Sequence, residues 1–245
     1  MSITVLRYSV SYRRNCDPMR AAKVESGEWV DGFLFVANRP ILDLLNTKPL
    51  LQQRPTELLS DFHAVERWLI ASGIARSAKM KNLLRSWRQS PEAAVFLKDL
   101  IAFRERLRDA VLRLEAGSAP ADEFIREVNA GLRQHPPIAT LHKQEGRIVR
   151  EALIDLERPS DLWTFIYDGT ADLLSEPETD RVRQCEACVV HFFDSSKKGS
   201  RRWCSMNMCG NKLKVAAYQR RKRDQPAVRR IWAPRRSDSI SPRKI

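Results

Sequence analysis

The sequence lacks several features that mark whole classes of protein. It has only 9 Gly and 13 Pro among 245 residues, too few for a collagen-like or mucin-like chain. Charged residues interrupt every apolar run before it reaches the roughly 18–20 residues of a membrane-spanning helix. The start has no apolar segment typical of a secretory signal peptide. Because 43% of the residues are apolar, we expect a folded, cytoplasmic protein that does not engage membranes.

Acidic residues are scarce at the C-terminal end. Residues 181–245 contain 18 Lys and Arg against 4 Asp and Glu, whereas the preceding part contains 25 basic and 26 acidic residues. The whole net charge of +13 therefore comes from the C-terminal end, a distribution typical of a module that binds a polyanion. Few large apolar residues accompany these charges, which favours nucleic acid over a membrane surface. We therefore expect the partner to be a nucleic acid.

Cysteine is also rare, but four of the five cysteines lie within 25 residues. Cys185 and Cys188 form C-x2-C, and Cys204 and Cys209 follow as C-x4-C after 15 residues. Two such pairs predict one tetrahedral zinc ion, and because four thiolates close the coordination shell, the zinc should be structural. A redox role for the first pair is disfavoured because its surroundings lack an α/β unit. His191 could replace one cysteine as a ligand, although we expect it to pack or to lie at the surface.

Apolar residues recur at helical spacing through most of the chain before the cysteines. They predict helices over residues 60–70, 77–87, 91–117, 121–132 and 160–174, with a hairpin formed by 138–141 and 148–153. The longest helix begins at the N-cap candidate Ser90 and ends at Gly117. Its apolar stripe should form the spine of the core, and it comprises Phe96, Leu100, Phe103, Leu107, Val111 and Leu114. The interleaved charged residues should form solvated faces, and they are Arg104, Glu105, Arg106, Arg108 and Asp109.

These patterns predict a mainly α protein. We expect a flexible extension over residues 1–28, a multihelical domain with a small β-hairpin over 29–178, a zinc module over 179–224, and a basic disordered tail over 225–245. The zinc module should be treble-clef-like or ribbon-like, opening as a hairpin around residues 189–193 and ending in a basic helix over 211–223.

The zinc module supplies the candidate nucleic-acid contacts. Trp203 is interpreted as a core plug, a side chain that fills space beside the zinc site, and not as a base-stacking platform. Asn211 either caps the last helix, which we favour, or reads a base edge. The predicted contacts are Lys197, Lys198, Arg201, Arg202, Asn211, Lys212, Lys214, Tyr218, Arg220, Arg221, Lys222 and Arg223.

The residues around the second cysteine pair resemble a known family. The run Arg201-Arg202-Trp203-Cys204-Ser205-Met206, followed by Cys209-Gly210-Asn211-Lys212, is similar to the signature of CGNR zinc-finger proteins. In that family the finger follows a helical ABATE domain, whose opening motif resembles Leu42-Asp43-Leu44-Leu45-Asn46-Thr47. The resemblance implies a transcription regulator. Lys212 stands where the family has arginine, which keeps the charge but loses the planar fork.

Three functional hypotheses follow. The first is a DNA-binding regulator whose helical domain senses a small-molecule effector or forms a homodimer. The second is an RNA-binding or ribosome-associated protein, which the same basic zinc module would serve. The third is an enzyme acting on a small molecule, which is disfavoured because no P-loop, GxSxG, HExxH or dinucleotide-binding motif occurs. We therefore expect no catalytic residues.

Overall fold

The computed structural model of the chain describes residues 5–8, 28–144 and 146–224. The expected tail over 225–245 lies outside these residues, as does most of the expected N-terminal extension. The α-helices are α1 (Pro40–Leu45), α2 (Phe62–Ala71), α3 (Ala78–Ser86), α4 (Pro91–Glu115), α5 (Asp122–Gln134), α6 (Trp163–Leu174) and α7 (Asn211–Asp224). Shorter helical turns are η1 (Pro159–Leu162), η2 (Thr179–Arg181) and η3 (Met206–Gly210). The strands are β1 (Val5–Tyr8), β2 (Glu28–Val30), β3 (Phe33–Phe35), β4 (Leu50–Leu51), β5 (Arg54–Pro55), β6 (Ile138–Gln144), β7 (Arg147–Asp155), β8 (Val182–Gln184) and β9 (His191–Phe193).

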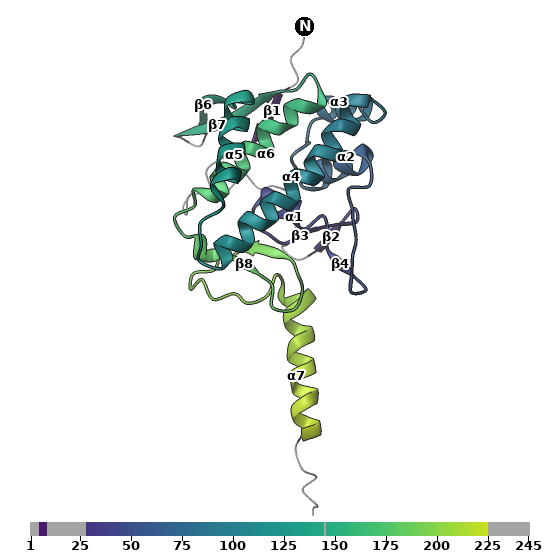
Figure 1. Cartoon of the computed structure of the whole chain (residues 1–245), viewed down its shortest axis with the longest axis vertical. Helices are drawn as coiled ribbons and strands as arrows, with labels where there is room; N and C mark the ends of the chain where they lie inside the picture. The colour runs from purple at the N-terminus through teal and green to yellow at the C-terminus, as the bar shows by residue number, and fades with distance from the viewer. Residues whose placement is uncertain (1–4, 9–27, 145, 225–245) are drawn as a thin grey trace, which may run out of the picture.

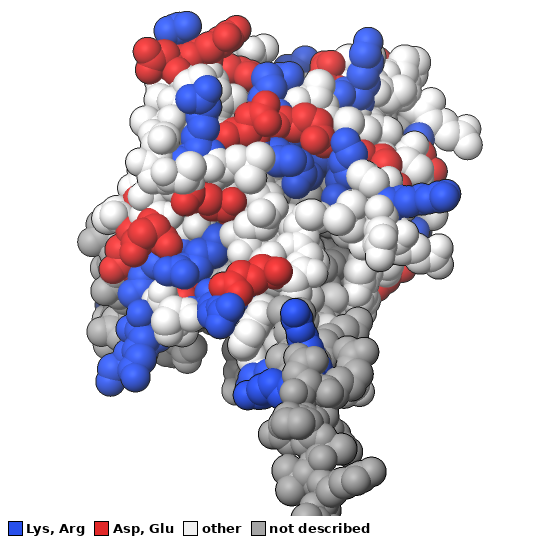
Figure 2. Space-filling model, turned by 60° about the horizontal axis from the view of Figure 1, so that its bottom comes forward, with Lys and Arg blue, Asp and Glu red and all other residues white. Residues whose placement is uncertain are grey.

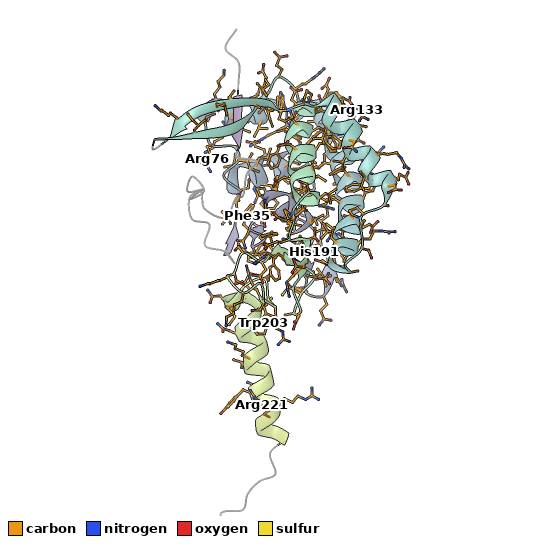
Figure 3. All side chains as sticks on the ribbon, turned by 90° about the vertical axis from the view of Figure 1, so that its left-hand side faces the viewer. Phe35, Arg76, Arg133, His191, Trp203 and Arg221 are labelled. Atoms are coloured by element: carbon orange, nitrogen blue, oxygen red, sulfur yellow. The ribbon has the colours of Figure 1, made fainter. Side chains whose placement is uncertain are left out.

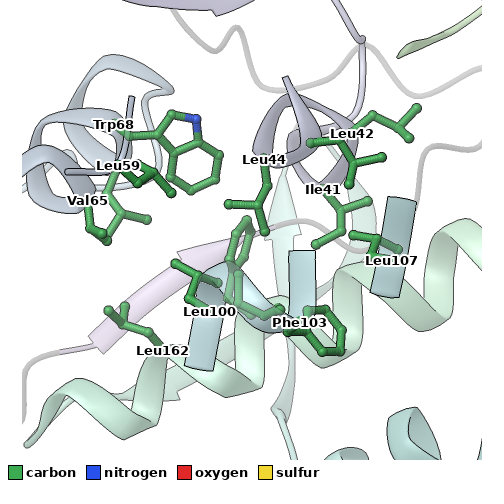
Figure 4. Packing of buried hydrophobic residues seen from close by; sticks show 14 of the residues in the cluster. Ile41, Leu42, Leu44, Leu59, Val65, Trp68, Leu100, Phe103, Leu107 and Leu162 are labelled. Carbon is green, nitrogen blue, oxygen red and sulfur yellow. The ribbon is translucent and has the colours of Figure 1, made fainter. Parts of the chain in front are cut away.

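The predicted mainly α class is confirmed, and α4 is the spine of the body (Figure 1). The Ser90 side chain accepts the N–H of Ala93 at 3.1 Å, Pro91 occupies the first turn, and Gly117 follows the helix with a φ of 72°. These are the start and stop signals that the sequence carries. All six residues of the predicted apolar stripe are buried. Figure 4 shows Leu100, Phe103 and Leu107 of α4 packed toward residues of α1.

One charged residue of α4 departs from the expected solvated face. The Arg104 side chain is completely buried, and its guanidinium donates to Glu57 at 2.5 and 2.8 Å and to the Thr47 hydroxyl at 2.8 Å. Glu105, the neighbouring residue, accepts a further hydrogen bond at 2.9 Å. The prediction failed because the segment after α1 folds over this side of α4 and brings acceptors to the cation.

The strands that the structure describes form four small antiparallel sheets. The predicted hairpin of β6 and β7 is confirmed, and β1 adds to β7 with Val5 opposite Asp155. Residues 5–8 of the expected flexible extension are therefore a paired strand, which is a correction to that prediction. The β2–β3 hairpin turns at Asp31 and Gly32, with φ values of 49° and 80° that suit a tight two-residue turn.

The β8–β9 hairpin lies against the end of the helical body opposite the β6–β7 hairpin, and α7 projects away from it (Figure 1). Its strands pair Val182 with Phe193 and Gln184 with His191. The strand predicted around 189–193 is therefore confirmed, but its partner precedes the first cysteine pair and does not follow the predicted turn at 194–200. Within the described ranges, no helix combines the length and the apolar character needed to cross a membrane.

Candidate metal centre and nucleic-acid interface

The first cysteine pair lies in the turn between β8 and β9. The Cys185 N–H donates to the Val190 carbonyl at 2.9 Å, and the Cys188 N–H donates to the Cys185 carbonyl at 3.3 Å. These bonds bend the backbone so that both sulfur atoms face the same point, which is how a C-x2-C segment presents two ligands to one ion.

The second pair frames a helical turn before α7. Cys204 is buried, and the side chain of the next residue, Ser205, accepts the Met208 N–H at 3.4 Å and caps η3, which carries Cys209. Asn211, which we favoured as the cap, is instead an exposed residue with helical backbone angles. The cap prediction was wrong because the helical path begins five residues earlier.

The four sulfur atoms fit a zinc ion. All four lie within 4.8 Å of one another, and the sulfur of Cys204 is 3.8 Å from that of Cys188 and 3.6 Å from that of Cys209. Zinc–sulfur bonds of about 2.3 Å at tetrahedral angles place sulfur atoms about 3.8 Å apart, which matches these separations. His191 is not part of the cluster.

The protonation of the cluster also favours a cation. Hydrogen bonds from Cys188 and Cys204 lower the pKa of Cys185. Hydrogen bonding to Cys185 raises the pKa of Cys188 to about 12 and also raises that of Cys204, while burial raises the pKa of Cys209. The protein alone therefore stabilises one thiolate, and a dication is the group that would stabilise four.

Two of the predicted phosphate-binding arginines are occupied within the module. The Arg201 guanidinium lies 4.6 Å from the centre of the Phe192 ring, and its Nε donates to the Trp203 carbonyl at 2.8 Å. Burial lowers the pKa of Arg201. Arg202 forms a two-pronged ion pair with Glu186 at 2.7 and 2.5 Å. Arg201 thus helps to fold the module, whereas the exposed Arg202 pair adds little stability.

The other predicted nucleic-acid contacts whose side chains the structure describes lie at the surface. Figure 2 shows Lys and Arg side chains beside the base of the projecting helix, with acidic side chains close by. Exposed residues of the loop and of α7 are Lys197, Lys198, Lys214, Tyr218, Arg220 and Arg221. The side chains of Lys212, Lys222 and Arg223 lie outside the described part of the structure.

Trp203 packs where the metal centre meets α7 (Figure 3). Its ring contacts the cluster that contains Cys185 and Cys204, and Lys214 of α7 lies 6.0 Å from the ring centre. A side chain on Gly210 would meet this ring and the Met206 sulfur, which explains the glycine of the motif. The interpretation of Trp203 as a core plug agrees with this packing.

Comparison with family models agrees with this geometry. The ABATE family, described as "Putative stress-induced transcription regulator", matches residues 38–177, which is more than half of the 245 residues. The chain belongs to the ABATE family. The CGNR zinc finger matches residues 181–222, so both resemblances seen in the sequence are confirmed, in the expected order. With its four clustered cysteines, the CGNR finger fits one structural zinc ion. None of the curated proteins matches the chain.

The CGNR finger and the ABATE domain share their apolar cores. Leu34 and Val36, which precede the ABATE motif, pack in the cluster that contains Cys185 and Cys204. Conversely, Phe193 of the finger packs in the main core. The two cores therefore interlock across the seam between the domains.

Polar residues of the ABATE motif hold this seam. The Asn46 amide donates to the His191 carbonyl at 2.9 Å and accepts the His191 N–H at 3.0 Å. Asp43, also buried, accepts the N–H groups of Val36 and Ala37 at 3.1 and 3.0 Å. Burial raises the pKa of Asp43 to about 7. The signal that could have identified these residues is two polar side chains inside an otherwise apolar run.

His191 also lies at the seam. Its side chain is buried, and its Nδ1 is 2.8 Å from a carboxylate oxygen of Glu115 at the end of α4. The side chain of His191 therefore packs against α4, as expected, and lies outside the cysteine cluster.

Proposed function

We propose that this ABATE-family protein is a cytoplasmic transcription regulator that binds double-stranded DNA through its CGNR finger and α7. On this proposal the ABATE domain senses a small-molecule effector, and the protein is not an enzyme. The family description supports a zinc-binding regulator. The observation that carries the DNA-binding part is the projection of α7 from the zinc-bound finger (Figure 1).

The exposure of α7 suits insertion into a groove. Its 14 residues make a rod about 21 Å long. Val215 and Tyr218 are 54% and 62% exposed, and Lys214, Arg220 and Arg221 are also exposed, so residues around much of the helix face solvent. An exposed basic helix held at one end by a rigid module can enter the major groove of DNA while the neighbouring loop contacts phosphates.

Zinc supports this arrangement mechanically. The finger has a small apolar core, and metal ligation supplies a large part of the folding free energy of such modules. Cys209 lies two residues before the start of α7, and therefore the metal centre fixes the start of the helix. Removal of zinc should release α7 and abolish DNA binding.

The test is fluorescence anisotropy of a labelled duplex of random sequence, titrated with the zinc-loaded full chain over a series of salt concentrations. If about six phosphates are neutralised, log K should fall with log salt at a slope of about −5. The double substitution Lys214→Ala and Arg221→Ala should make the slope shallower by about 2. The control is Arg113→Ala with Arg133→Ala, which removes two exposed cations of the ABATE domain and should keep the slope.

Three outcomes would overturn the proposal. They are affinity without salt dependence, equal effects of the two double variants, and persistence of binding after chelation. Stronger competition by RNA than by duplex DNA of the same sequence would instead favour an RNA-binding protein.

A further inference from the structure

The ABATE domain contains a cavity that the finger does not use. Its volume is about 510 Å³, and it lies between α4, the end of α5, and the start of α6 with its preceding turn η1. Cavities of this size typically hold a small organic molecule. It lies toward the end of α5 that carries Arg133, at the opposite end of the molecule from α7 (Figure 3).

Three rings form one wall of the cavity. The Trp163 and Tyr167 rings stack with centres 5.2 Å apart and planes at 28°, and His135 stacks on Tyr167 at 6.1 Å and 17°. Phe103 supports Trp163 and Tyr167 edge-on from the core. A side chain on Gly131 would collide with the Tyr167 ring, so this glycine lets the ring lie flat against α5. Because these rings stack on one another, a planar ligand would meet them at their edges, and an edge-to-face contact is one of the arrangements that aromatic rings favour.

One of the two cations that line the cavity is only weakly paired. Arg106 is held by a two-pronged ion pair with Glu127 at 2.8 and 2.6 Å, and the lining carboxylate, Asp99, lies close enough to act on Arg106 electrostatically. Arg158 is different, because its side chain is 75% exposed and its ion pair with Asp161 is long, at 3.4 Å. Burial lowers the pKa of His135, and its imidazole is therefore neutral near pH 7. Arg158 is thus the lining cation best placed to meet a ligand.

We propose that this cavity binds a small aromatic carboxylate, with its ring against Trp163 and Tyr167 and its carboxylate toward Arg158. We further propose that this class of ligand is the effector of the regulator, a step that rests on the proposed function.

Two of the three helices that line the cavity also reach the finger. On α4, Arg106 lines the cavity and Glu115, nine residues later, contacts His191 of the finger. On α6, Tyr167 lines the cavity and Asp172 accepts from Arg39 at 2.9 Å. The Arg39 guanidinium lies 4.6 Å from the centre of the Phe193 ring of the finger. A ligand that shifts either helix would therefore move residues that hold the finger against the ABATE domain.

The first experiment is calorimetric titration of the zinc-loaded full chain, without DNA, using benzoate as the probe. Cyclohexanecarboxylate keeps the charge without the aromatic ring, and benzyl alcohol keeps the ring without the charge. We expect benzoate to bind about tenfold or more tightly than either analogue. Arg158→Glu should weaken benzoate binding by about tenfold or more, whereas Arg126→Glu, the same charge change at an exposed position of α5, should alter it by less than about twofold.

Absence of saturable benzoate binding would overturn the site. Equal affinity for the analogues, or equal losses in the two variants, would overturn the assigned ligand class and its contact with Arg158. The second experiment repeats the DNA titration with saturating benzoate, and a change in DNA affinity that is absent in Arg158→Glu supports the effector role. An unchanged DNA affinity would overturn that role alone, whereas a failure of the chain to bind DNA at all would overturn the proposed function and leave the calorimetric result standing.

Discussion

Removal of the Asn46 amide should loosen the finger as well as the ABATE domain. Asn46 is 3% exposed, and its side chain forms two hydrogen bonds with the backbone of His191. The substitution Asn46→Ala would leave one buried N–H and one buried carbonyl without their partner. At about 1–2 kcal/mol for each unsatisfied group, we expect the free energy of unfolding to fall by about 2–4 kcal/mol.

The assay is urea unfolding of the zinc-loaded full chain, followed by circular dichroism and by tryptophan fluorescence. With a slope of about 2 kcal/mol per molar urea, the midpoint should fall by about 1–2 M. The control, Asn82→Ala, removes an exposed amide from α3 and should change stability by less than about 0.5 kcal/mol. A second measurement is the rate at which a chelator removes zinc. This rate should rise in Asn46→Ala, because the finger loses the two hydrogen bonds that join His191 to the ABATE domain.

Equal midpoints for Asn46→Ala and Asn82→Ala would refute the reasoning. A loss of stability with an unchanged rate of zinc removal would show that the finger is an independent unit, contrary to the shared core.

Two further predictions concern buried charges of the ABATE domain. Because burial raises the pKa of Asp43 to about 7, the folded state keeps a proton that the unfolded state releases near its ordinary value of 3.8. Stability from this group should therefore be present at low pH and be lost as the pH rises from about 4 to about 7. The difference in melting temperature between the wild type and Asp43→Asn should change over that range, and parallel curves would contradict this. Arg104→Met should lower the free energy of unfolding by about 3–5 kcal/mol, because it leaves the Glu57 carboxylate without its buried partner. Arg113→Met, at an exposed position of α4, should lower it little in the same thermal unfolding assay. Equal losses in the two variants would contradict the role of Arg104.

The elements that the sequence predicted well are those with local signals. Ser77 and Ser90 each accept an N–H three residues later and begin α3 and α4, as their positions before apolar periodic segments indicated. The metal centre was equally predictable, because cysteines two to four residues apart can reach one ion whatever the rest of the fold does. Caps and metal knuckles are short-range features, and sequence spacing determines them.

The missed features depend on contacts between distant segments. Arg104 resembles its exposed neighbours in the sequence, and only the fold brings Thr47 and Glu57 to it. The bond from Asn46 to His191 spans 145 positions, so no local pattern could reveal it. The cavity likewise draws its wall from three separate elements. Burial of polar groups is decided by tertiary partners, which periodicity does not encode.

The shared core limits how the regulator can work. Were the finger attached by a flexible linker, effector binding in the ABATE domain could not change its orientation. Val182 and Phe193 of the finger pack in the main core, and Leu34 and Val36 of the ABATE side pack beside the cysteines. Tilting α7 would therefore require repacking of both clusters, because close-packed cores switch between discrete arrangements and do not deform continuously. On the proposed function, an effector should act by changing the population of molecules in which the finger is packed against the ABATE domain. Zinc stabilises that state, and it should therefore strengthen the coupling between effector binding and DNA binding.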